Sequence, residues 1–297
     1  MYDSIVIGAG PAGLTASIFL RRSNKKVLVL EANYYGGQII NTPKIENYPA
    51  FENISGFDFA TKIYNQAKNF GVEIVFERAV EIKNYDDYKE VVTNKKTYQT
   101  KTIILATGSD NRHLNIEREK ELLGKGVSYC ATCDGAFYKG KNVAVIGGAN
   151  TAVTNALYMS NLCPKVYLIY RGSKLKCEKV LLDSLKEKSN IEVIYNSNVK
   201  EIIGNRVLES IVLDNGQELK ISGMFISIGM DAQTKLVKNL LPLSEQNYVL
   251  SDDCSTIKTS IFVAGDCRHK TIRQLTTAMS DGAVAASFAI KYLENNQ

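Results

Sequence analysis

Two cysteines three residues apart form the most chemically specific feature of the sequence. Cys130 and Cys133 enclose Ala-Thr, and Asp134 follows directly. A Cys-x-x-Cys pair closes and opens a disulfide with little backbone change, which suits thiol–disulfide exchange. Asp134 stands where a carboxyl group could move a proton during that exchange, or it could cap the turn at Gly135. The spacing therefore predicts a redox-active disulfide, and both roles, acid–base residue and turn cap, stay open for Asp134.

The other cysteines and the histidines do not complete a metal site. A zinc site would need two more ligands, but the remaining cysteines form no second Cys-x-x-Cys, and His113 and His269 lack ligand spacing. We therefore expect no metal. Six cysteines in 297 residues are too few for a disulfide scaffold. The other four are expected to be small apolar core residues: Cys163, Cys177, Cys254 and Cys267.

A glycine-rich turn near the N-terminus predicts a dinucleotide site. Residues 4–7 are strand-like, and the turn Gly8-Ala9-Gly10-Pro11-Ala12-Gly13 leads into a helix over 14–23. Gly8 permits the tight turn, Gly10 lets a pyrophosphate approach the backbone, and Gly13 allows close helix–strand packing. A second strand ends in Glu31, which can accept ribose hydroxyls and would repel a 2′-phosphate. The expected ligand is FAD or NAD.

A second turn of the same kind follows a strand over 142–146 and precedes a helix over 153–162, but it is degraded. Gly147 is in place, whereas Ala149 occupies the position of the second glycine and Ala152 that of the third. The next strand ends in Tyr170-Arg171, without a carboxylate for a ribose. This turn has the scaffold of a nucleotide site with a methyl group where the pyrophosphate would approach.

Alternating strand and helix patterns around both turns predict an α/β fold with parallel sheets. The first turn belongs to residues 1–112, the second to residues 113–240, and a tail covers 241–297. The formal charge of +5 is mild and forms no nucleic-acid-binding pattern. No apolar run approaches the roughly 18–20 residues that cross a bilayer. We expect a cytoplasmic protein that binds neither nucleic acid nor membrane.

Together these motifs resemble the low-molecular-weight thioredoxin reductase family over essentially the whole chain. The resemblance rests on the two motifs above and on five shorter ones: Gly36-Gly37-Gln38, Glu46-Asn47-Tyr48-Pro49, Ala106-Thr107-Gly108, Gly265-Asp266 and Arg273-Gln274. It implies two Rossmann-like, three-layer ββα domains. The chain ends (1–112 and 241–297) form the FAD domain, and the second domain (113–240), which carries the Cys-x-x-Cys, is inserted in it.

The resemblance also implies roles for individual residues. Cys133 corresponds to the cysteine beside the flavin ring, and Asp134 to the proton donor of the family. Asp266 corresponds to the residue that holds the ribityl chain. The expected acceptor is thioredoxin, and the expected assembly is a homodimer. The remaining residues implied at the FAD site are Gly37, Gln38, Asn47, Ala106, Thr107, Gly108, Gly265, Arg273, Gln274 and Leu275.

All departures from the family fall on the nicotinamide side. NADPH-using members carry Gly-Gly-Gly-Asp-Ser-Ala with paired glutamates, and a His-Arg-Arg cluster that grips the 2′-phosphate. This chain has Ala149-Asn150 in the first motif, Thr154-Asn155 for the glutamates, and only Arg171 of the cluster. It resembles most closely the ferredoxin-dependent flavin thioredoxin reductases of clostridia, so reduced ferredoxin is the expected donor. The alternative is an NADPH-dependent reductase whose divergent site uses Arg171, Lys174 and Lys176.

Two other functions are less consistent with the sequence. A ferredoxin–nicotinamide reductase of similar fold lacks the Cys-x-x-Cys, so Cys130 and Cys133 argue against it. A non-enzymatic flavin-bound redox sensor stays an alternative, and activity measurements on cysteine variants separate it from an enzyme.

Overall fold

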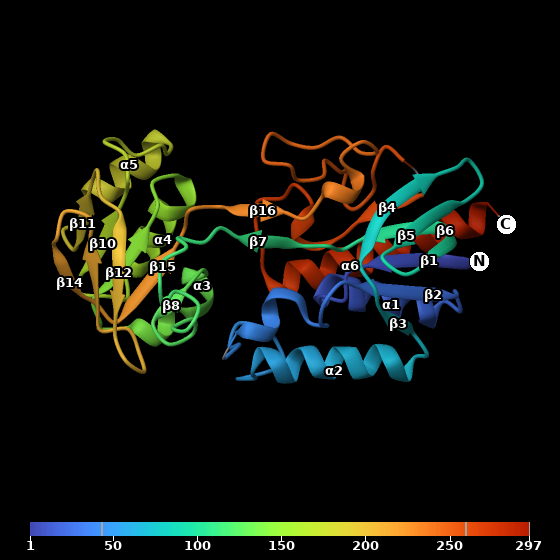
Figure 1. Ribbon diagram of the computed structural model, residues 1–297, viewed down its shortest axis with the longest axis horizontal. Coiled ribbons are helices and arrows are strands. Elements are labelled where there is room, and N and C mark those ends of the chain that lie inside the picture. The colour runs from blue at the N-terminus through green and yellow to red at the C-terminus, as the bar shows by residue number, and fades with distance from the viewer. Residues whose placement is uncertain (43, 259, 297) are drawn as a thin grey trace. The chain divides into compact units, whose positions relative to one another are not determined.

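The computed structural model divides the protein into two compact units (Figure 1). The structure describes residues 1–42, 44–258 and 260–296. Unit 1 comprises Met1–Asp110 and Asp231–Gln297, and unit 2 comprises Asn111–Met230. Unit 2 is thus an insertion in unit 1. The two connecting segments, β7 (Ser109–Asn111) and β16 (Met230–Ala232), pair with each other.

Unit 1 is built on a parallel sheet in the order β3-β2-β1-β6, with β17 pairing beside β6. Residues alternate between two buried faces: Val6 points into one apolar cluster, and Ile5 and Ile7 point into another. Burial on both faces explains why these strands are continuous apolar runs. The strands are β1 (Tyr2–Ile7), β2 (Val27–Glu31), β3 (Glu73–Phe76), β6 (Thr97–Leu105) and β17 (Ile261–Val263).

Helices cover one face of this sheet, and an antiparallel extension continues it. Helix α1 packs on α6 and α2, and their apolar residues join the cluster that contains Val6. Strand β5 pairs antiparallel with the first half of β6, and β4 pairs antiparallel with β5. The helices are α1 (Pro11–Arg22), α2 (Gly56–Asn69) and α6 (Leu275–Asn295), with short 3-10 turns η1 (Gly37–Asn41), η3 (Lys235–Val237) and η4 (Gly265–Cys267). The added strands are β4 (Ala79–Asn84) and β5 (Lys89–Thr93).

Unit 2 repeats this plan on a smaller scale. Its parallel sheet has the order β11-β10-β9-β15-β8, and a three-stranded antiparallel sheet, β12-β13-β14, completes it. Val145 points into the cluster shared with α4, whereas Ile146 points into the cluster shared with β12 and β13. The helices are α3 (Ala131–Asp134), η2 (Gly135–Tyr138), α4 (Asn150–Ser160) and α5 (Lys179–Lys186). The strands are β8 (Val127–Ser128), β9 (Val143–Ile146), β10 (Val166–Ile169), β11 (Ile191–Ile194), β12 (Val199–Ile203), β13 (Ser210–Leu213), β14 (Glu218–Lys220) and β15 (Gly223–Ile226).

The predicted fold class, two nested α/β dinucleotide-binding domains with parallel sheets, is confirmed. The chain returns to unit 1 at Asp231, ten residues before the expected boundary at 241. The reason is local packing: Val237 and Leu241 are buried in an apolar cluster of unit 1. Residues 111 and 112, expected in the first domain, belong to unit 2.

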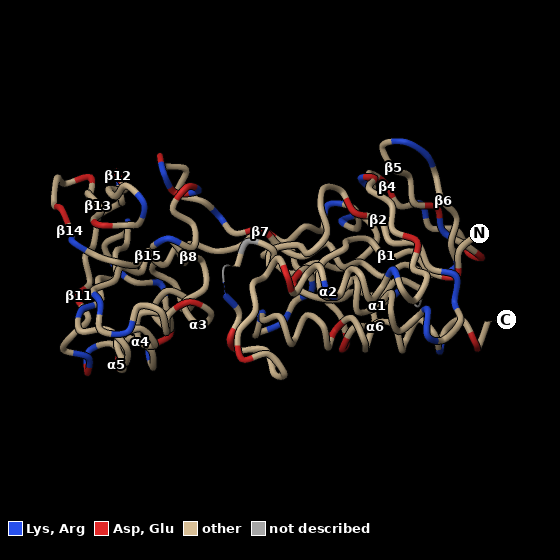
Figure 2. The backbone as a smooth tube through the Cα atoms, turned by 90° about the horizontal axis from the view of Figure 1, so that it is seen from below, with Lys and Arg blue, Asp and Glu red and all other residues tan. Residues whose placement is uncertain are grey.

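Basic and acidic positions are interspersed along each unit (Figure 2). Within the described parts of the chain, no helix is both long enough and apolar enough to span a membrane.

Candidate functional site

The first glycine-rich turn joins β1 to α1, and two of its glycines are required by protein packing. Gly8 has φ +110°, and a Cβ there would lie 2.3 Å from the Ala106 carbonyl oxygen. A Cβ on Gly13 would lie 1.9 Å from the Gly8 carbonyl oxygen. Both distances are far inside van der Waals contact. These two glycines therefore let strands and helix approach one another closely.

Gly10 has no such packing reason. Its backbone is extended (φ −76°, ψ −179°), a conformation open to any residue. A Cβ added there would lie 3.9 Å from the nearest atom, the Cα of Gly37. The open space lies at the N-terminus of α1, with Pro11 in its first turn and without a side-chain cap on its N–H groups. Open space beside uncapped helix N–H donors fits a pyrophosphate.

Glu31, the predicted ribose acceptor, is held at the end of β2 by two backbone donors. Ala9 N–H donates to Oε2 at 2.8 Å, and Asn33 N–H donates to Oε1 at 2.9 Å. Each carboxylate oxygen has further acceptor capacity, so the carboxylate is oriented and still able to accept hydroxyl groups.

The structure brings several predicted cofactor residues of unit 1 together in pairs. Gly37 faces Gly10, as described above. Asn47 Nδ2 donates to Gln274 Oε1 at 3.2 Å, joining residues 227 positions apart. Gln38 Nε2 donates to Asp110 Oδ1 at 2.9 Å. These contacts orient the amide side chains.

The predicted segment Ala106-Thr107-Gly108 follows β6 and is anchored by a residue that the sequence did not indicate. Thr107 Oγ1 donates to the Gln233 carbonyl at 2.5 Å, and Gln233 N–H donates to the Gly108 carbonyl at 3.0 Å. Gly108 has φ +70°, and nothing lies within 4 Å of a Cβ placed on it. As at Gly10, open space borders this turn.

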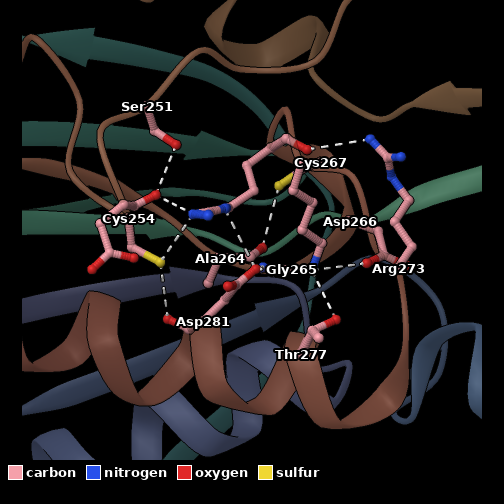
Figure 3. Close-up of polar contacts among 12 residues, drawn as sticks. Ser251, Cys254, Ala264, Gly265, Asp266, Cys267, Arg273, Thr277 and Asp281 are labelled. Atoms are coloured by element: carbon pink, nitrogen blue, oxygen red, sulfur yellow. Dashed lines mark hydrogen bonds and ion pairs between the residues drawn. The ribbon is translucent and has the colours of Figure 1, made fainter.

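Gly265-Asp266 follows β17, where the family resemblance places the ribityl chain (Figure 3). Oδ1 of Asp266 is buried and lies 3.3 Å from Lys270 Nζ in an ion pair, while the side chain as a whole stays 27% exposed. Burial raises the pKa of Asp266, and Lys270 opposes that rise. A carboxylate that is fixed on one side by a cation and partly exposed on the other can accept a ligand hydroxyl.

The segment after it carries the other predicted flavin residues. The Arg273 guanidinium lies 4.0 Å from the centre of the Tyr248 ring, which fixes it by a cation–π contact. Gln274 caps α6 in a reciprocal capping box with Thr277, and Leu275 begins the helix. The uncrowded position at Gly10 and the partly exposed Asp266 carboxylate together fit FAD, whose pyrophosphate and ribityl hydroxyls need those features.

The second chemical centre lies in unit 2, where Cys130 and Cys133 form a disulfide with a Cα–Cα distance of 5.3 Å. Both residues are half-buried. Cys130 caps the short helix α3: its Sγ accepts the Cys133 N–H at 3.2 Å. The pair therefore sits on a defined helical turn that remains accessible from solvent.

Asp134 is held beside this disulfide by Ser128. The Ser128 hydroxyl donates to Oδ2 at 2.6 Å and accepts the Cys130 N–H at 3.0 Å, so one hydroxyl links carboxyl and disulfide segment. Burial raises the pKa of Asp134, and the Ser128 bond opposes that rise. Its Oδ1 is buried without a hydrogen-bond partner in the described part of the chain. The alternative capping role is wrong, because no side chain caps the turn η2 at Gly135.

Comparison with known proteins gives one consistent result. The family of pyridine nucleotide-disulphide oxidoreductases matches residues 2–282. The thioredoxin reductase of Bacillus subtilis (strain 168) is 38% identical over 304 residues, 100% of this chain and 96% of that protein. A Clostridium pasteurianum protein described as "34.2 kDa protein in rubredoxin operon" is 40% identical over 298 residues, 98% of this chain and 97% of that one. The crystal structure of the thioredoxin reductase from Streptococcus pyogenes MGAS5005 matches with a TM-score of 0.95 and 39% identity over 99% of both chains.

The chain belongs to the low-molecular-weight thioredoxin reductase family. That family binds FAD, so the predicted cofactor is confirmed. The chain is thus a thioredoxin reductase-like flavoprotein oxidoreductase with a Cys130–Cys133 disulfide.

The second glycine-rich turn shows how this thioredoxin reductase-like chain differs from an ordinary dinucleotide site. Ala149 precedes α4 with φ −100° and ψ 179°, the same extended backbone that Gly10 has before α1. The two turns are therefore equivalent in conformation, but the second carries a methyl group where the first is bare. The neighbouring Gly148 is explained by packing, because a Cβ there would lie 2.3 Å from the Tyr170 ring.

A segment after β10, residues 176–178, is hydrogen-bonded to this second turn. Lys176 N–H donates to the Gly148 carbonyl at 2.7 Å. Asn150 Nδ2 donates to Glu178 Oε1 at 2.8 Å, and Glu178 N–H donates to Asn150 Oδ1 at 2.9 Å. The Asn150 side chain is thus paired with Glu178, while the N–H groups at the start of α4 lack a side-chain cap, as at α1.

The sequence did not indicate three polar residues that organise the FAD side: Gln233, Lys270 and Asp281. Asp281 Oδ2 accepts the Gly265 N–H at 3.0 Å and lies 2.9 Å from Lys270 Nζ. One signal was available: Gly282 stands inside the pattern of α6, and a Cβ there would lie 2.2 Å from the Ala12 carbonyl oxygen. A glycine inside a helix marks such a close approach.

Proposed function

We propose that this flavoprotein reduces thioredoxin through the Cys130–Cys133 disulfide and takes its electrons from reduced ferredoxin. The observation that carries the choice of donor is the contrast between the two glycine-rich turns. Gly10 leaves open space in the first turn, whereas Ala149 carries a methyl group at the equivalent place in the second. We expect this methyl group to hinder a pyrophosphate at the second turn, whereas no side chain stands at the equivalent place in the first.

The set of cationic side chains that could bind the 2′-phosphate of NADPH is also reduced. Of the family cluster that binds the 2′-phosphate, Arg171 is present, and Gly172 replaces the second arginine. Gly172 is a packing residue here, because a Cβ on it would lie 2.7 Å from the Tyr170 ring. With Arg171 as the one remaining guanidinium, the phosphate would lose one of its two bidentate partners.

The energetics allow ferredoxin to serve. A ferredoxin near −400 mV and a dithiol near −270 mV differ by about 130 mV, which favours reduction of the disulfide. Bound FAD supplies a carrier that accepts single electrons and delivers a pair. Two reduced ferredoxins are oxidised for each disulfide reduced, and two protons are taken up.

The chain's own residues hold this cofactor and complete the proton balance. We propose that the turn Gly8–Gly13 binds the pyrophosphate, Glu31 the ribose and Asp266 the ribityl hydroxyls. Asp134 holds a proton on its buried carboxyl and gives it to a thiolate released when the disulfide opens. The other residues proposed along the FAD are Gly37, Gln38, Asn47, Ala106, Thr107, Gly108, Gly265, Arg273, Gln274 and Leu275.

Delivery to thioredoxin is an exchange between two disulfides. A thiolate of the reduced Cys130/Cys133 pair attacks the thioredoxin disulfide and forms a mixed disulfide, and the other cysteine then displaces thioredoxin. Thioredoxin leaves as a dithiol, and the Cys130–Cys133 bond is restored. We further propose a cytoplasmic homodimer. The family resemblance supports the dimer, and a catalytic rather than structural Cys pair is typical of a reducing compartment.

The second candidate donor is NADPH. The exposed side chains Arg171, Lys174 and Lys176 follow β10, where they could replace part of the lost phosphate grip. Lysine is a point charge without the guanidinium fork, so this grip would be weaker than that of the family.

Anaerobic turnover tests the proposal. Thioredoxin thiols are measured with reduced ferredoxin, NADPH or NADH as the only donor, and Cys133→Ser serves as the inactive control. We expect ferredoxin alone to sustain turnover. Turnover with NADPH at micromolar concentration would establish the alternative donor, and absence of thioredoxin reduction with every donor would contradict the acceptor.

A further inference from the structure

Behind Asp266, unit 1 contains a compact group of charged side chains (Figure 3). They come from η4, from the segment that follows it, and from the first half of α6. Lys270 lies at the centre, and its side chain is only 8% exposed. A buried ammonium group is costly unless it is paired. What it pairs with therefore indicates its role.

Lys270 contacts two carboxylates and a hydroxyl. Its Nζ lies 2.9 Å from Asp281 Oδ2, 3.3 Å from Asp266 Oδ1 and 3.5 Å from Thr277 Oγ1. Asp266 and Asp281 belong to segments that meet only through folding, and one cation stands between them. Without it, two largely buried negative charges would face each other.

Asp281 fixes the backbone immediately before Asp266. Its Oδ2 accepts the Gly265 N–H at 3.0 Å, and Gly265 holds φ +77°, a conformation that favours glycine. The Arg268 Nε lies 3.6 Å from the same oxygen and adds a second cation. Asp281 is therefore occupied by the protein on Oδ2, whereas Asp266 contacts Lys270 through Oδ1 and its side chain stays 27% exposed.

The charged groups that act on Asp266 are known. Burial has the largest effect and raises the pKa of Asp266, Lys270 and Arg273 lower it, and Asp281 raises it. Lys270 makes the larger of the two favourable contributions. Without Lys270, burial and Asp281 would raise the pKa of Asp266, and chiefly Arg273 would be left to lower it.

We infer that Lys270 is a positioning residue for FAD binding, which keeps the Asp266 carboxylate ionised and aimed so that it can accept hydrogen bonds from cofactor hydroxyls. The inference rests on the proposed assignment of Asp266 to FAD. A neutral Asp266 would lose charge-assisted acceptance, which is about twice as strong as a neutral hydrogen bond.

The test measures the dissociation constant of FAD from apoprotein, by quenching of FAD fluorescence, at about pH 6 and about pH 9. For Lys270→Met we expect binding weakened roughly 10- to 100-fold at the lower pH and to within about threefold of wild type at the higher pH, because Asp266 then ionises unaided. Lys270→Arg keeps the cation and should restore most of the affinity. Lys291→Met, on the exposed face of α6, is the matched control.

Two further variants separate this role from a purely structural one. Asp266→Asn should weaken FAD binding equally at both pH values. The double variant with Lys270→Met should bind FAD almost as well as Asp266→Asn alone. Asp281→Asn leaves Lys270 beside Asp266. Its loss of FAD affinity should therefore be smaller than that of Lys270→Met, and it should be the same at both pH values. This last variant keeps the inference testable even if Lys270→Met fails to fold.

The inference is overturned if Lys270→Met weakens FAD equally at both pH values, if its effect persists when it is combined with Asp266→Asn, or if Asp281→Asn reproduces it fully. Unchanged FAD affinity in Asp266→Asn would remove the Asp266 assignment itself. None of these outcomes depends on whether ferredoxin or NADPH reduces the flavin, so a wrong donor would be recognised separately.

Discussion

The Ser128 hydroxyl donates a 2.6 Å hydrogen bond to Asp134 Oδ2 and accepts the backbone N–H of Cys130. A single hydroxyl therefore fixes the carboxyl group relative to the disulfide. Burial raises the pKa of this carboxyl, so the protonated form is favoured more in the folded protein than in the unfolded chain. In the proposed mechanism, this protonated form supplies the proton.

Asp134→Asn should slow thioredoxin reduction by roughly 100- to 10,000-fold, the range for loss of an acid–base group. Steady-state turnover measures this, with bound FAD and intact disulfide as controls. A variant with the wild-type rate would contradict the proton-donor role.

The same substitution should stabilise the fold near neutral pH. Because the folded pKa of Asp134 is raised, its ionisation destabilises the native state as pH rises from the unfolded value of about 3.9 through the folded value. Asparagine cannot ionise, so it removes this loss of stability, and its side-chain oxygen still accepts the hydrogen bond from Ser128. Urea titration should show a higher free energy of unfolding than wild type at neutral pH and no difference at acidic pH. A gain in unfolding free energy of equal size at both pH values would contradict the assigned cause.

Gly10→Ala should abolish FAD binding while leaving the fold intact. Its backbone conformation suits alanine, and the nearest protein atom would lie 3.9 Å from the new methyl. The purified variant should be colourless with a melting temperature close to that of wild-type apoprotein. Ala149→Gly is the matched change in the second turn and should keep full FAD. Yellow Gly10→Ala protein would show that the pyrophosphate lies elsewhere.

Cys130→Ser and Cys133→Ser should each abolish thioredoxin reduction and keep bound FAD, since the disulfide lies in unit 2 and the cofactor residues lie in unit 1. Visible spectra give the FAD content, and thiol release gives the activity. Cys163→Ser is the control, because Cys163 is buried and donates to the Tyr138 carbonyl. Residual turnover in either paired-cysteine variant would argue against a dithiol pathway.

Glu119→Ala should destabilise the protein more than Tyr129→Phe. The buried Glu119 carboxylate accepts the Tyr129 hydroxyl and the N–H groups of Leu114 and Asn115. Removing it leaves three donors without their shared acceptor, at about 3 kcal/mol, whereas Tyr129→Phe removes the two hydrogen bonds of one hydroxyl, to Glu119 and His113, at about 2 kcal/mol. Unfolding free energies from urea titration decide, and equal losses would contradict this account.

The sequence was sufficient where function depends on local backbone geometry. The Gly8–Gly13 turn and the Cys130–Cys133 spacing each specify a conformation within a few residues, so both were recognisable. The starts of α1 and α4 were predicted three residues too late, because each helix begins inside its turn, at Pro11 and Asn150.

Residues paired by tertiary structure could not be found in this way. Thr107 donates a hydrogen bond to Gln233, which is 126 positions away in the sequence. Likewise, the role of Lys270 can be recognised only once α6 places Asp281 beside it. The sequence also left two roles open for Asp134. Only the structure removed the capping role, because Asp134 accepts from Ser128 and makes no cap at the turn; the proton-donor role stays a prediction.

The most direct test of the central claim is an anaerobic titration of the bound flavin with reduced ferredoxin, NADPH and NADH in parallel. The methyl of Ala149 and the missing arginine at Gly172 predict that ferredoxin bleaches the flavin absorbance at near-stoichiometric amounts and that neither nicotinamide does so at micromolar concentration. Rapid bleaching by micromolar NADPH would contradict the account and identify the second turn as a working nucleotide site.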